Sequence, residues 1–201
     1  AEGASPIPLI FSGDTLVAAD KPPGLTVIPA SGELGERSLR GRLEQQLGCR
    51  LWVVHRLDRD ASGVVVFART ADAHRDLSLA FERRQVHKTY LAFTAGAPTL
   101  PVGRITLALH SARHNKARPA ALGEPGAREA ATGYAVRRQW GVAEHGVAMV
   151  EACPETGRHH QIRVHLRAIG TPILFDALYG RRHAPPELAD APCQRLALHA
   201  L

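Results

Sequence analysis

The sequence is poor in sulfur-containing and aromatic residues. Its 201 residues include three cysteines, one methionine and an aromatic fraction of 5%. Cys49, Cys153 and Cys193 lie far apart and form no CxxC pair, so the spacing favours neither a disulfide framework nor a paired-cysteine metal site. We expect these cysteines to be reduced thiols in structural positions.

Long apolar runs and nucleotide-binding loops are also missing. No segment approaches the roughly 20 apolar residues that a transmembrane helix needs, and residues 1–8 lack the basic-then-apolar layout of a signal peptide. The sequence therefore predicts a cytoplasmic protein with no membrane attachment. It contains no P-loop and no GxGxxG, so nothing in it favours a nucleotide cofactor.

Lysine is scarce, whereas arginine is abundant. Lysine and arginine together number 25 against 19 acidic residues, a net charge of +6, and lysine occurs only at Lys21, Lys88 and Lys116. Arginine suits bidentate contacts with phosphate and stacking on bases. The excess favours a polyanionic partner such as RNA, although a skewed genome composition produces the same bias.

The first half of the chain carries clear start and stop signals. Residues 16–19 predict a short buried strand that enters a rigid turn at Lys21–Gly24. Ser38 and Thr70 are typical first residues of helices, and Gly48 is a typical stop for the first of them. The helices carry apolar stripes at Leu39, Leu43 and Leu47, and at Ala73, Leu77 and Phe81.

The remaining segments predict mostly strands. Strand character is found at residues 51–54, 64–68, 88–94, 134–140 and 146–152. Residues 97–133 are rich in Gly, Pro and basic residues with weak periodicity, which predicts a long hairpin or mobile loop. Its basic tip, near Arg113, His114, Lys116 and Arg118, is either solvated or grips RNA.

The last helix is expected from about Arg158 to Gly170. Its buried stripe would be Ile162, Leu166 and Ile169, with His159, Arg163 and Arg167 on other faces. Strand signals outweigh helix signals overall. We therefore predict one α+β domain over residues 1–201, with a central, mainly antiparallel β-sheet flanked by helices and loops.

The polar segment His55–Gly63 concentrates charge between two predicted strands. It holds two carboxylates, two arginines and a histidine. An aspartate flanked by arginines stays ionised and can act as a nucleophile or as an electrostatic stabiliser. From these residues alone, a salt-bridged structural turn is the simpler interpretation.

The same segment resembles the HRLDxxTSG signature of the RluA family of pseudouridine synthases, with Ala61 in place of the usual threonine. Further resemblances follow in the family's order through most of the chain. They are Asp20–Gly24 (KPxG), Lys88–Ala92 (KxYxA), Arg128–Tyr134 (ATxY), Gly157–His165 (GRxHQIRVH), Gly170–Ile173, Asp176–Gly180 and Arg195–Ala200 (RLxLHA).

The resemblance implies a pseudouridine synthase-like fold and an isomerase that acts on uridine in RNA. The base is detached from C1′, turned and rejoined through C5, with no metal and no cofactor. Asp58 matches the catalytic aspartate of the family. A carboxylate can attack the sugar carbon or abstract a sugar proton, and the sequence leaves both routes open.

The resemblance also implies roles for three further residues. Tyr90 matches the active-site tyrosine, whose ring can stack on the flipped uracil and whose hydroxyl can help to remove the C5 proton. Arg163 matches the arginine that pairs with the catalytic aspartate, and Arg56 matches the one that enters the space left by the flipped nucleotide. Taken singly, the three residues would be interpreted as strand packing, a solvated helix arginine and a surface ion pair.

Three more residues of the matching segments are candidates for substrate contact. Arg158 and Gln161 belong to the GRxHQIRVH segment, and His55 either orders its turn or touches substrate. His160 and His165 are five residues apart and no HExxH is present, so we expect no metal site.

The chain departs from the family at a few positions. The KPxG-like segment begins at Asp20, so we expect a stand-alone catalytic domain with no preceding S4 RNA-binding module. Phe175 stands where the family often has glycine, and the chain ends directly after the RLxLHA-like segment. We expect a monomer that acts on transfer RNA or ribosomal RNA. The alternatives are a catalytically inactive RNA-binding module of the same fold and a metal-dependent hydrolase.

Overall fold

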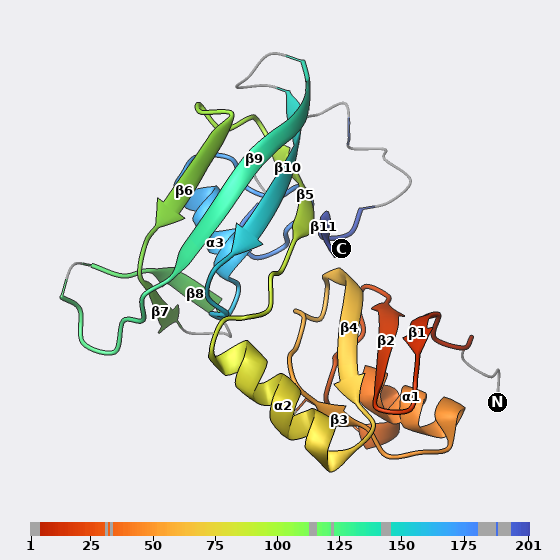
Figure 1. Cartoon of the computed structure of the whole chain (residues 1–201). Coiled ribbons are helices and arrows are strands. Elements are labelled where there is room, and N and C mark those ends of the chain that lie inside the picture. The colour runs from red at the N-terminus through yellow and green to blue at the C-terminus, as the bar shows by residue number, and fades with distance from the viewer. Residues whose placement is uncertain are drawn as a thin grey trace. The chain divides into compact units, whose positions relative to one another are not determined.

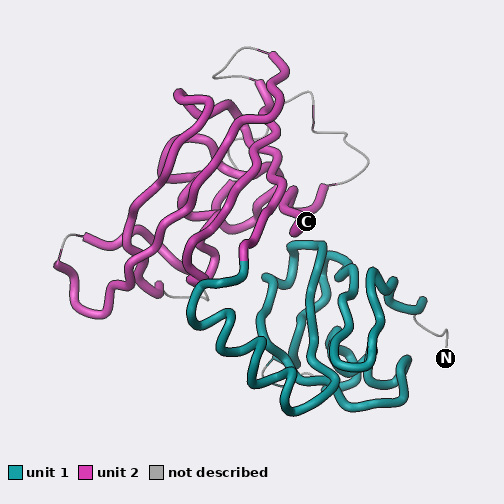
Figure 2. The backbone as a smooth tube through the Cα atoms, viewed as in Figure 1, with its two compact units in different colours: residues 1–86 teal, residues 87–201 magenta. Residues whose placement is uncertain are grey.

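The computed structural model describes residues 5–30, 32, 34–112, 116–121, 123–141, 146–180, 188 and 194–201. The chain divides into two compact units, residues 1–86 and 87–201, which are described separately (Figure 2). Arg113 and His114 of the predicted basic tip, and Cys193, lie outside the described residues.

The first unit is a small antiparallel sheet with two helices (Figure 1). β2 lies between β1 and β4, and β3 pairs with the far end of β4, opposite Phe67 and Ala68. Its elements are β1 (Leu9–Ser12), β2 (Leu16–Lys21), the 3-10 helix η1 (Gly35–Arg37), α1 (Leu39–Leu47), β3 (Trp52–Val53), β4 (Ser62–Ala68) and α2 (Ala71–Glu82).

Both predicted helix starts in this unit are confirmed. The Ser38 hydroxyl accepts a hydrogen bond from the backbone N–H of Gly41 at the start of α1, and the Thr70 hydroxyl caps α2 from one residue before it. Gly48 ends α1 with a φ of 65°, a left-handed conformation that glycine adopts without steric cost. Leu39 and Leu43 are fully buried, so the leucine stripe of α1 forms core.

The second unit has a larger antiparallel sheet in the order β11-β5-β10-β9-β6, and a separate hairpin of β7 and β8. α3 packs against β9 and β10 and also against β8. The elements are β5 (Tyr90–Ala95), β6 (Val102–Thr106), β7 (Leu109–Ala112), β8 (Lys116–Pro119), β9 (Ala131–Trp140), β10 (Val147–Pro154), α3 (Gln161–Ala168) and β11 (Leu198–Ala200).

Of the two predictions for residues 97–133, a long hairpin or a mobile loop, the described residues confirm the hairpin, whose pairing continues from β6 and β9 to Leu109 opposite Arg128. The segment contributes β6, which pairs with β9 from Val102 opposite Ala135 to Thr106 opposite Ala131, and then the β7–β8 hairpin. β6 carries exposed residues along most of its length, so it has no regular apolar alternation. An edge strand of this kind gives a weak sequence signal because pairing with one neighbour, rather than burial, holds it in place.

The position of α3 also differs from the prediction. The helix begins at Gln161, and His160 before it has a φ of 53°, so His159 lies outside the helix. All residues from 161 to 166 are buried, whereas Ile169 is only half-buried. The buried surface of α3 is therefore wider than a single stripe and includes Arg163, because the helix is enclosed by the sheet and the hairpin.

The described strands and helices confirm an α+β fold with mainly antiparallel sheet. No helix within the described residues has the length and apolar character needed to cross a membrane.

Candidate active site

The loop that carries Asp58 runs from β3 to β4 in the first unit. Leu57 is buried and fixes the middle of the loop, while Arg56 is exposed and Asp58 is half-exposed. This alternation of exposed and buried residues is expected in a functional loop, because the buried Leu57 anchors the loop and its polar neighbours then face solvent. The loop therefore holds a carboxylate and a guanidinium accessible beside one another in sequence.

A buried lysine joins the KPxG-like turn to this loop. Lys21 is 0% exposed, and its ammonium donates hydrogen bonds to the carbonyls of Pro22, Leu25 and Arg59, at 2.9, 2.7 and 2.8 Å. The Arg59 side chain donates in return to the carbonyl of Gly24, at 3.1 Å. A buried ammonium requires such acceptors. One side chain therefore holds the turn at Lys21 against the loop at Arg59, 38 residues further along the chain.

His55 has a structural role in the first unit. Its Nε2 accepts a hydrogen bond from the backbone N–H of Val66 at 2.9 Å, and its ring stacks on Phe81, with centroids 4.8 Å apart. His55 thereby ties the start of the loop to β4 and α2, which is the turn-ordering interpretation. Its predicted contact with substrate stays a prediction.

Ala61 stands where the family signature has threonine, and it is 1% exposed. A buried threonine would need a partner for its hydroxyl, whereas alanine needs none. The departure from the signature therefore leaves no polar group unsatisfied at this position.

Tyr90 begins β5 in the second unit. It lies opposite Ala152 of β10 and Ala200 of β11, and its side chain is half-exposed. Small neighbours on both adjacent strands leave space beside the ring at these register positions. Tyr90 is therefore not simply a core residue of the sheet.

Arg163 is buried on α3 and paired within its own unit. Its guanidinium donates from Nε and Nη2 to the two carboxylate oxygens of Asp176, at 2.7 and 2.8 Å, and lies 5.1 Å from the ring centroid of Tyr179. The arginine side chain is 4% exposed and the aspartate 0%. Arg163 is therefore not a solvated helix arginine, because α3 is enclosed on the face that carries it. The predicted pairing of Arg163 with Asp58 stays a prediction.

Gln161, a predicted substrate contact, has all its hydrogen-bonding capacity engaged. Its oxygen accepts from the Thr156 hydroxyl and from the backbone N–H of Arg158, at 2.6 and 3.0 Å. Its amide nitrogen donates to the carbonyl of Ala131 and to the Thr132 hydroxyl, each at 2.9 Å. Since a carboxamide has two acceptor and two donor positions, Gln161 holds the start of α3 against β9. Its contact with substrate stays a prediction.

His165 continues the buried hydrogen-bond chain from Thr132. Its Nδ1 lies 2.9 Å from the Thr132 hydroxyl and its Nε2 lies 3.0 Å from the carbonyl of Leu107. A carbonyl can only accept, so Nε2 carries the proton and Nδ1 accepts from Thr132. Burial lowers the pKa of His165, and the hydrogen bond to Leu107 opposes that change in part.

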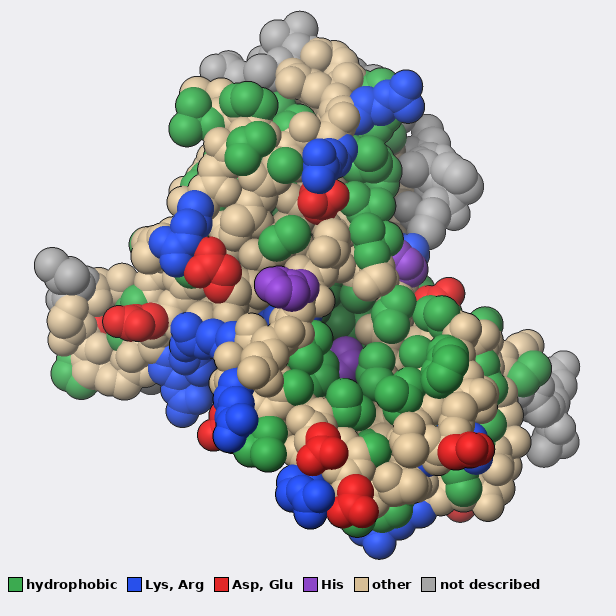
Figure 3. Space-filling model, in the orientation of Figure 1, with side chains coloured by type: hydrophobic (Ala, Val, Ile, Leu, Met, Phe, Trp, Pro, Cys, Tyr) green, Lys and Arg blue, Asp and Glu red, His purple; other side chains and the backbone are tan. Residues whose placement is uncertain are grey.

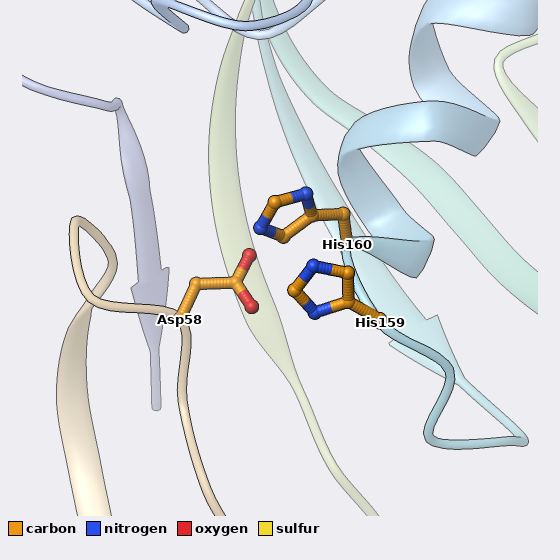
Figure 4. A group of neighbouring side chains, drawn as sticks. All are labelled: Asp58, His159 and His160. Carbon is orange, nitrogen blue, oxygen red and sulfur yellow. The ribbon is translucent and has the colours of Figure 1, made fainter. Parts of the chain in front are cut away.

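The turn before α3 carries two histidines and Arg158. The rings of His159 and His160 stack with centroids 3.7 Å apart (Figure 4), and His160 Nδ1 lies 2.9 Å from the Tyr179 hydroxyl. Arg158 is half-exposed and its Nε donates to the carbonyl of Glu129 at 3.0 Å. The turn is thus fixed by side chains on both sides of it.

Several exposed arginines of the second unit form ion pairs with glutamates. Arg104 pairs with Glu155 through two hydrogen bonds of 2.7 Å, and Arg137 pairs with Glu151. Basic and acidic side chains lie beside one another at several places on the face drawn in Figure 3. In the β7–β8 region, hydrogen bonding from Arg118 lowers the pKa of Glu124 to about 2. The positive charges of these arginines are thus compensated locally.

A cavity of about 740 Å³ lies in the first unit, away from the Asp58 loop. Arg40, Glu44, Arg50 and Trp52 are among its lining residues. β3 pairs with the end of β4, whereas the Asp58 loop enters its start at Ser62. The cavity is therefore at the other end of the strand from the candidate site.

Comparison with known proteins places the chain in a family. The model of the RNA pseudouridylate synthase family matches residues 15–168. The chain belongs to this family. The chain is 36% identical to the dual-specificity RNA pseudouridine synthase RluA of Escherichia coli K12, over 96% of this chain and 83% of that protein.

Two further similarities extend the comparison. The ribosomal large subunit pseudouridine synthase D of Nitrosomonas europaea is 35% identical over 98% of this chain, and the chain spans 57% of its length. The solved structure of human RNA pseudouridylate synthase domain containing 1 matches all of this chain and 80% of that one, with a TM-score of 0.79 and 22% identity. The latter likeness shows the pseudouridylate synthase fold.

Sequence reasoning gave no role to Asp176 and Tyr179, although both stand in a segment that resembles the family. The available signal was Arg163, because a charged residue on a helix must have a counter-charge if its face of the helix is buried. The Arg163–Asp176 pair depends on the turn at residues 175–180, and the sequence does not indicate that this turn lies close to α3.

Proposed function

We propose that the chain is an RNA pseudouridine synthase that isomerises specific uridines in transfer RNA, ribosomal RNA or both. The observation that carries this proposal is the family match over residues 15–168, which includes the HRLD segment with Asp58. The reaction breaks the C1′–N1 bond, rotates the uracil and forms a C1′–C5 bond. C5 then loses its proton and N1 gains one, so the product is an isomer of the substrate. No redox step is involved.

Asp58 is the key catalytic group in this proposal. A carboxylate can stabilise or trap the sugar carbon as the glycosidic bond breaks, or remove a sugar proton, and it is regenerated at the end. The position of Asp58 on a loop held by Lys21 and His55 supports this role, because a reacting group needs a fixed orientation.

The other proposed roles follow the chemistry of the side chains. Tyr90 stacks on the flipped base and assists the loss of the C5 proton, and its half-exposed position beside two alanines supports this. Arg163 orients the carboxylate of Asp58, and the exposed Arg56 occupies the space that the flipped nucleotide leaves. Arg158, Gln161 and His55 remain proposed substrate contacts.

We propose that the two units act together as one catalytic domain, in a cytoplasmic monomer that needs no metal and no cofactor. The name of one relative refers to the large ribosomal subunit, and the name of the other refers to dual RNA specificity, which supports ribosomal RNA as one substrate and leaves room for a second. The inactive RNA-binding alternative is not favoured, because the relatives that match nearly the whole chain are named as enzymes.

Pseudouridine formation on transfer and ribosomal RNA transcripts, in the presence of a chelator, tests this function. Wild-type protein is expected to form pseudouridine, whereas Asp58→Asn abolishes turnover and keeps RNA affinity within about threefold. Asp60→Asn is the matched control, since it removes an exposed carboxylate from the same loop and should leave turnover intact. Turnover by Asp58→Asn, or the absence of product from wild type, would contradict the proposal.

A further inference from the structure

The carboxylate of Asp176 is the counter-charge of Arg163 inside the second unit. Both side chains are almost completely buried, and two parallel N–H···O bonds join them. This bidentate geometry fixes the plane of a guanidinium as well as its position. A buried arginine without a paired carboxylate would be strongly unfavourable, so α3 in this orientation requires Asp176.

Asp176 is itself held by the chain that follows it. Its Oδ1 accepts hydrogen bonds from the backbone N–H groups of Leu178 and Tyr179, at 3.0 and 3.2 Å, in addition to the bond from Arg163. Gly180 closes the turn by donating its N–H to the Asp176 carbonyl at 2.8 Å. A Cβ at position 180 would lie 2.5 Å from the carbonyl oxygen of Ile173, so glycine is needed there.

Tyr179 connects this ion pair to the β7–β8 hairpin. Its ring lies against the guanidinium of Arg163, and its hydroxyl accepts the backbone N–H of Ala117 in β8, at 2.8 Å. The ring is part of a buried cluster with Leu109, Ala117 and Val164. The hairpin, α3 and the turn therefore share one side chain.

From these contacts we infer that Asp176 and Tyr179 are positioning residues that hold the guanidinium of Arg163 in its working orientation. Asp176 sets the plane of the Arg163 guanidinium and supplies its counter-charge. The ring of Tyr179 packs against the same guanidinium, and its hydroxyl links the guanidinium's position to that of the β7–β8 hairpin. The inference rests on the proposed function, because the orientation of Arg163 matters to turnover only if Arg163 acts on the catalytic carboxylate.

A double-mutant cycle on pseudouridine formation tests this inference, with Asp176→Asn, Arg163→Lys and the double variant. Asp176→Asn is expected to lower kcat by about 100-fold, since small misplacements of a catalytic group have effects of that size. RNA affinity should change by less than about threefold. If Asp176 acts through Arg163, the double variant is no slower than Arg163→Lys within about threefold. Multiplicative losses, or wild-type kcat for Asp176→Asn, would overturn the inference.

Tyr179→Phe keeps the test valid if Asp176→Asn folds poorly. It retains the ring against Arg163 and removes the hydroxyl, which accepts from Ala117 and also contacts His160 Nδ1. We therefore expect a smaller fall in kcat with unchanged RNA affinity. Unchanged kcat in this variant would contradict the hairpin connection. The unfolding transition of each variant is measured by circular dichroism, and all assays are made at temperatures below it.

A nitrogen–proton correlation spectrum of the arginine Nε–H groups separates failure of the inference from failure of the proposed function. The Arg163 signal, assigned by its loss in Arg163→Lys, should be protected from solvent exchange in wild type and lose that protection in Asp176→Asn. This result does not depend on activity. A protected Arg163 signal in Asp176→Asn would refute the positioning role even in an active enzyme.

Discussion

Phe175 adopts a left-handed backbone conformation, with a φ of 56°, directly before the turn that presents Asp176. This region is unfavourable for residues with a Cβ and is most easily occupied by glycine. The conformation accounts for the glycine that the family often has at this position. In this chain the strain is tolerated beside a turn that is fixed by the Asp176 hydrogen bonds.

Replacement of Phe175 is expected to reveal this backbone strain. Phe175→Gly should be more stable than Phe175→Ala by about 1 kcal/mol, although both lose the ring, because glycine adopts positive φ without steric cost. The free energies of unfolding, measured in urea, give the comparison. A more stable alanine variant would show that the backbone is relaxed at this position.

Burial of His165 makes the stability of the fold dependent on pH. Its pKa lies below the ordinary value of 6.5 because its surroundings disfavour the charged ring. As the pH falls below about 6.5, the unfolded chain takes up a proton that the folded chain excludes. The contribution of His165 is therefore fully present above that pH and is lost as the pH falls towards the lower folded value.

His165→Gln is expected to remove this part of the pH dependence. Wild-type protein should lose stability as the pH falls below about 6.5, and the variant should show a smaller slope, even if it is less stable at neutral pH. Thermal or urea unfolding over this pH range measures both slopes. Equal slopes would mean that His165 is protonated in the folded state or that its pKa is unchanged.

At the scale of elements, one buried side chain organises the catalytic loop. The Lys21 ammonium joins the end of β2 to the loop before β4, and His55 joins the other end of that loop to β4 and α2. The predictions from sequence located these strands and helices correctly, because caps and apolar stripes are local signals. The same patterns gave no indication that Lys21 is completely buried.

Lys21→Met is expected to destabilise the first unit and to lower turnover. The substitution keeps most of the apolar stem but leaves three carbonyls without their donor, which should cost about 3 kcal/mol of unfolding free energy. Lys116→Met in β8 is the control and should have a much smaller effect. Urea unfolding and pseudouridine formation measure the two consequences. Wild-type stability of Lys21→Met would show that the three carbonyls do not depend on the ammonium.

At the scale of the molecule, the total of 25 lysines and arginines overstates the number of basic side chains that are available to RNA. Arg104, Arg118 and Arg137 are each paired with a glutamate of the same unit. Arginines in such pairs would have to exchange one anion for another to bind phosphate, so they gain little. The affinity for RNA should therefore depend mainly on arginines outside these pairs.

RNA binding measured over a range of salt concentrations tests this distribution of charge. Arg56→Gln, at an exposed position of the Asp58 loop, is expected to weaken binding and to reduce the salt slope by about 1 if Arg56 contacts phosphate. Arg137→Gln is the matched control, an exposed arginine already held by Glu151, and should change neither quantity. Equal effects of the two variants would contradict the distinction.

The sequence by itself determined the fold class, the capped helices α1 and α2, most of the sheet strands and the family. Helix caps, stripes and the charged HRLD segment are short-range features, and their order along the chain is unaffected by folding. Only the tertiary structure decided that Lys21 and Arg163 are buried, that β6 joins a sheet, and that Asp176 and Tyr179 hold Arg163. Those outcomes depend on which segments, distant in sequence, enclose a side chain. Local sequence patterns do not indicate which distant segments come together in space.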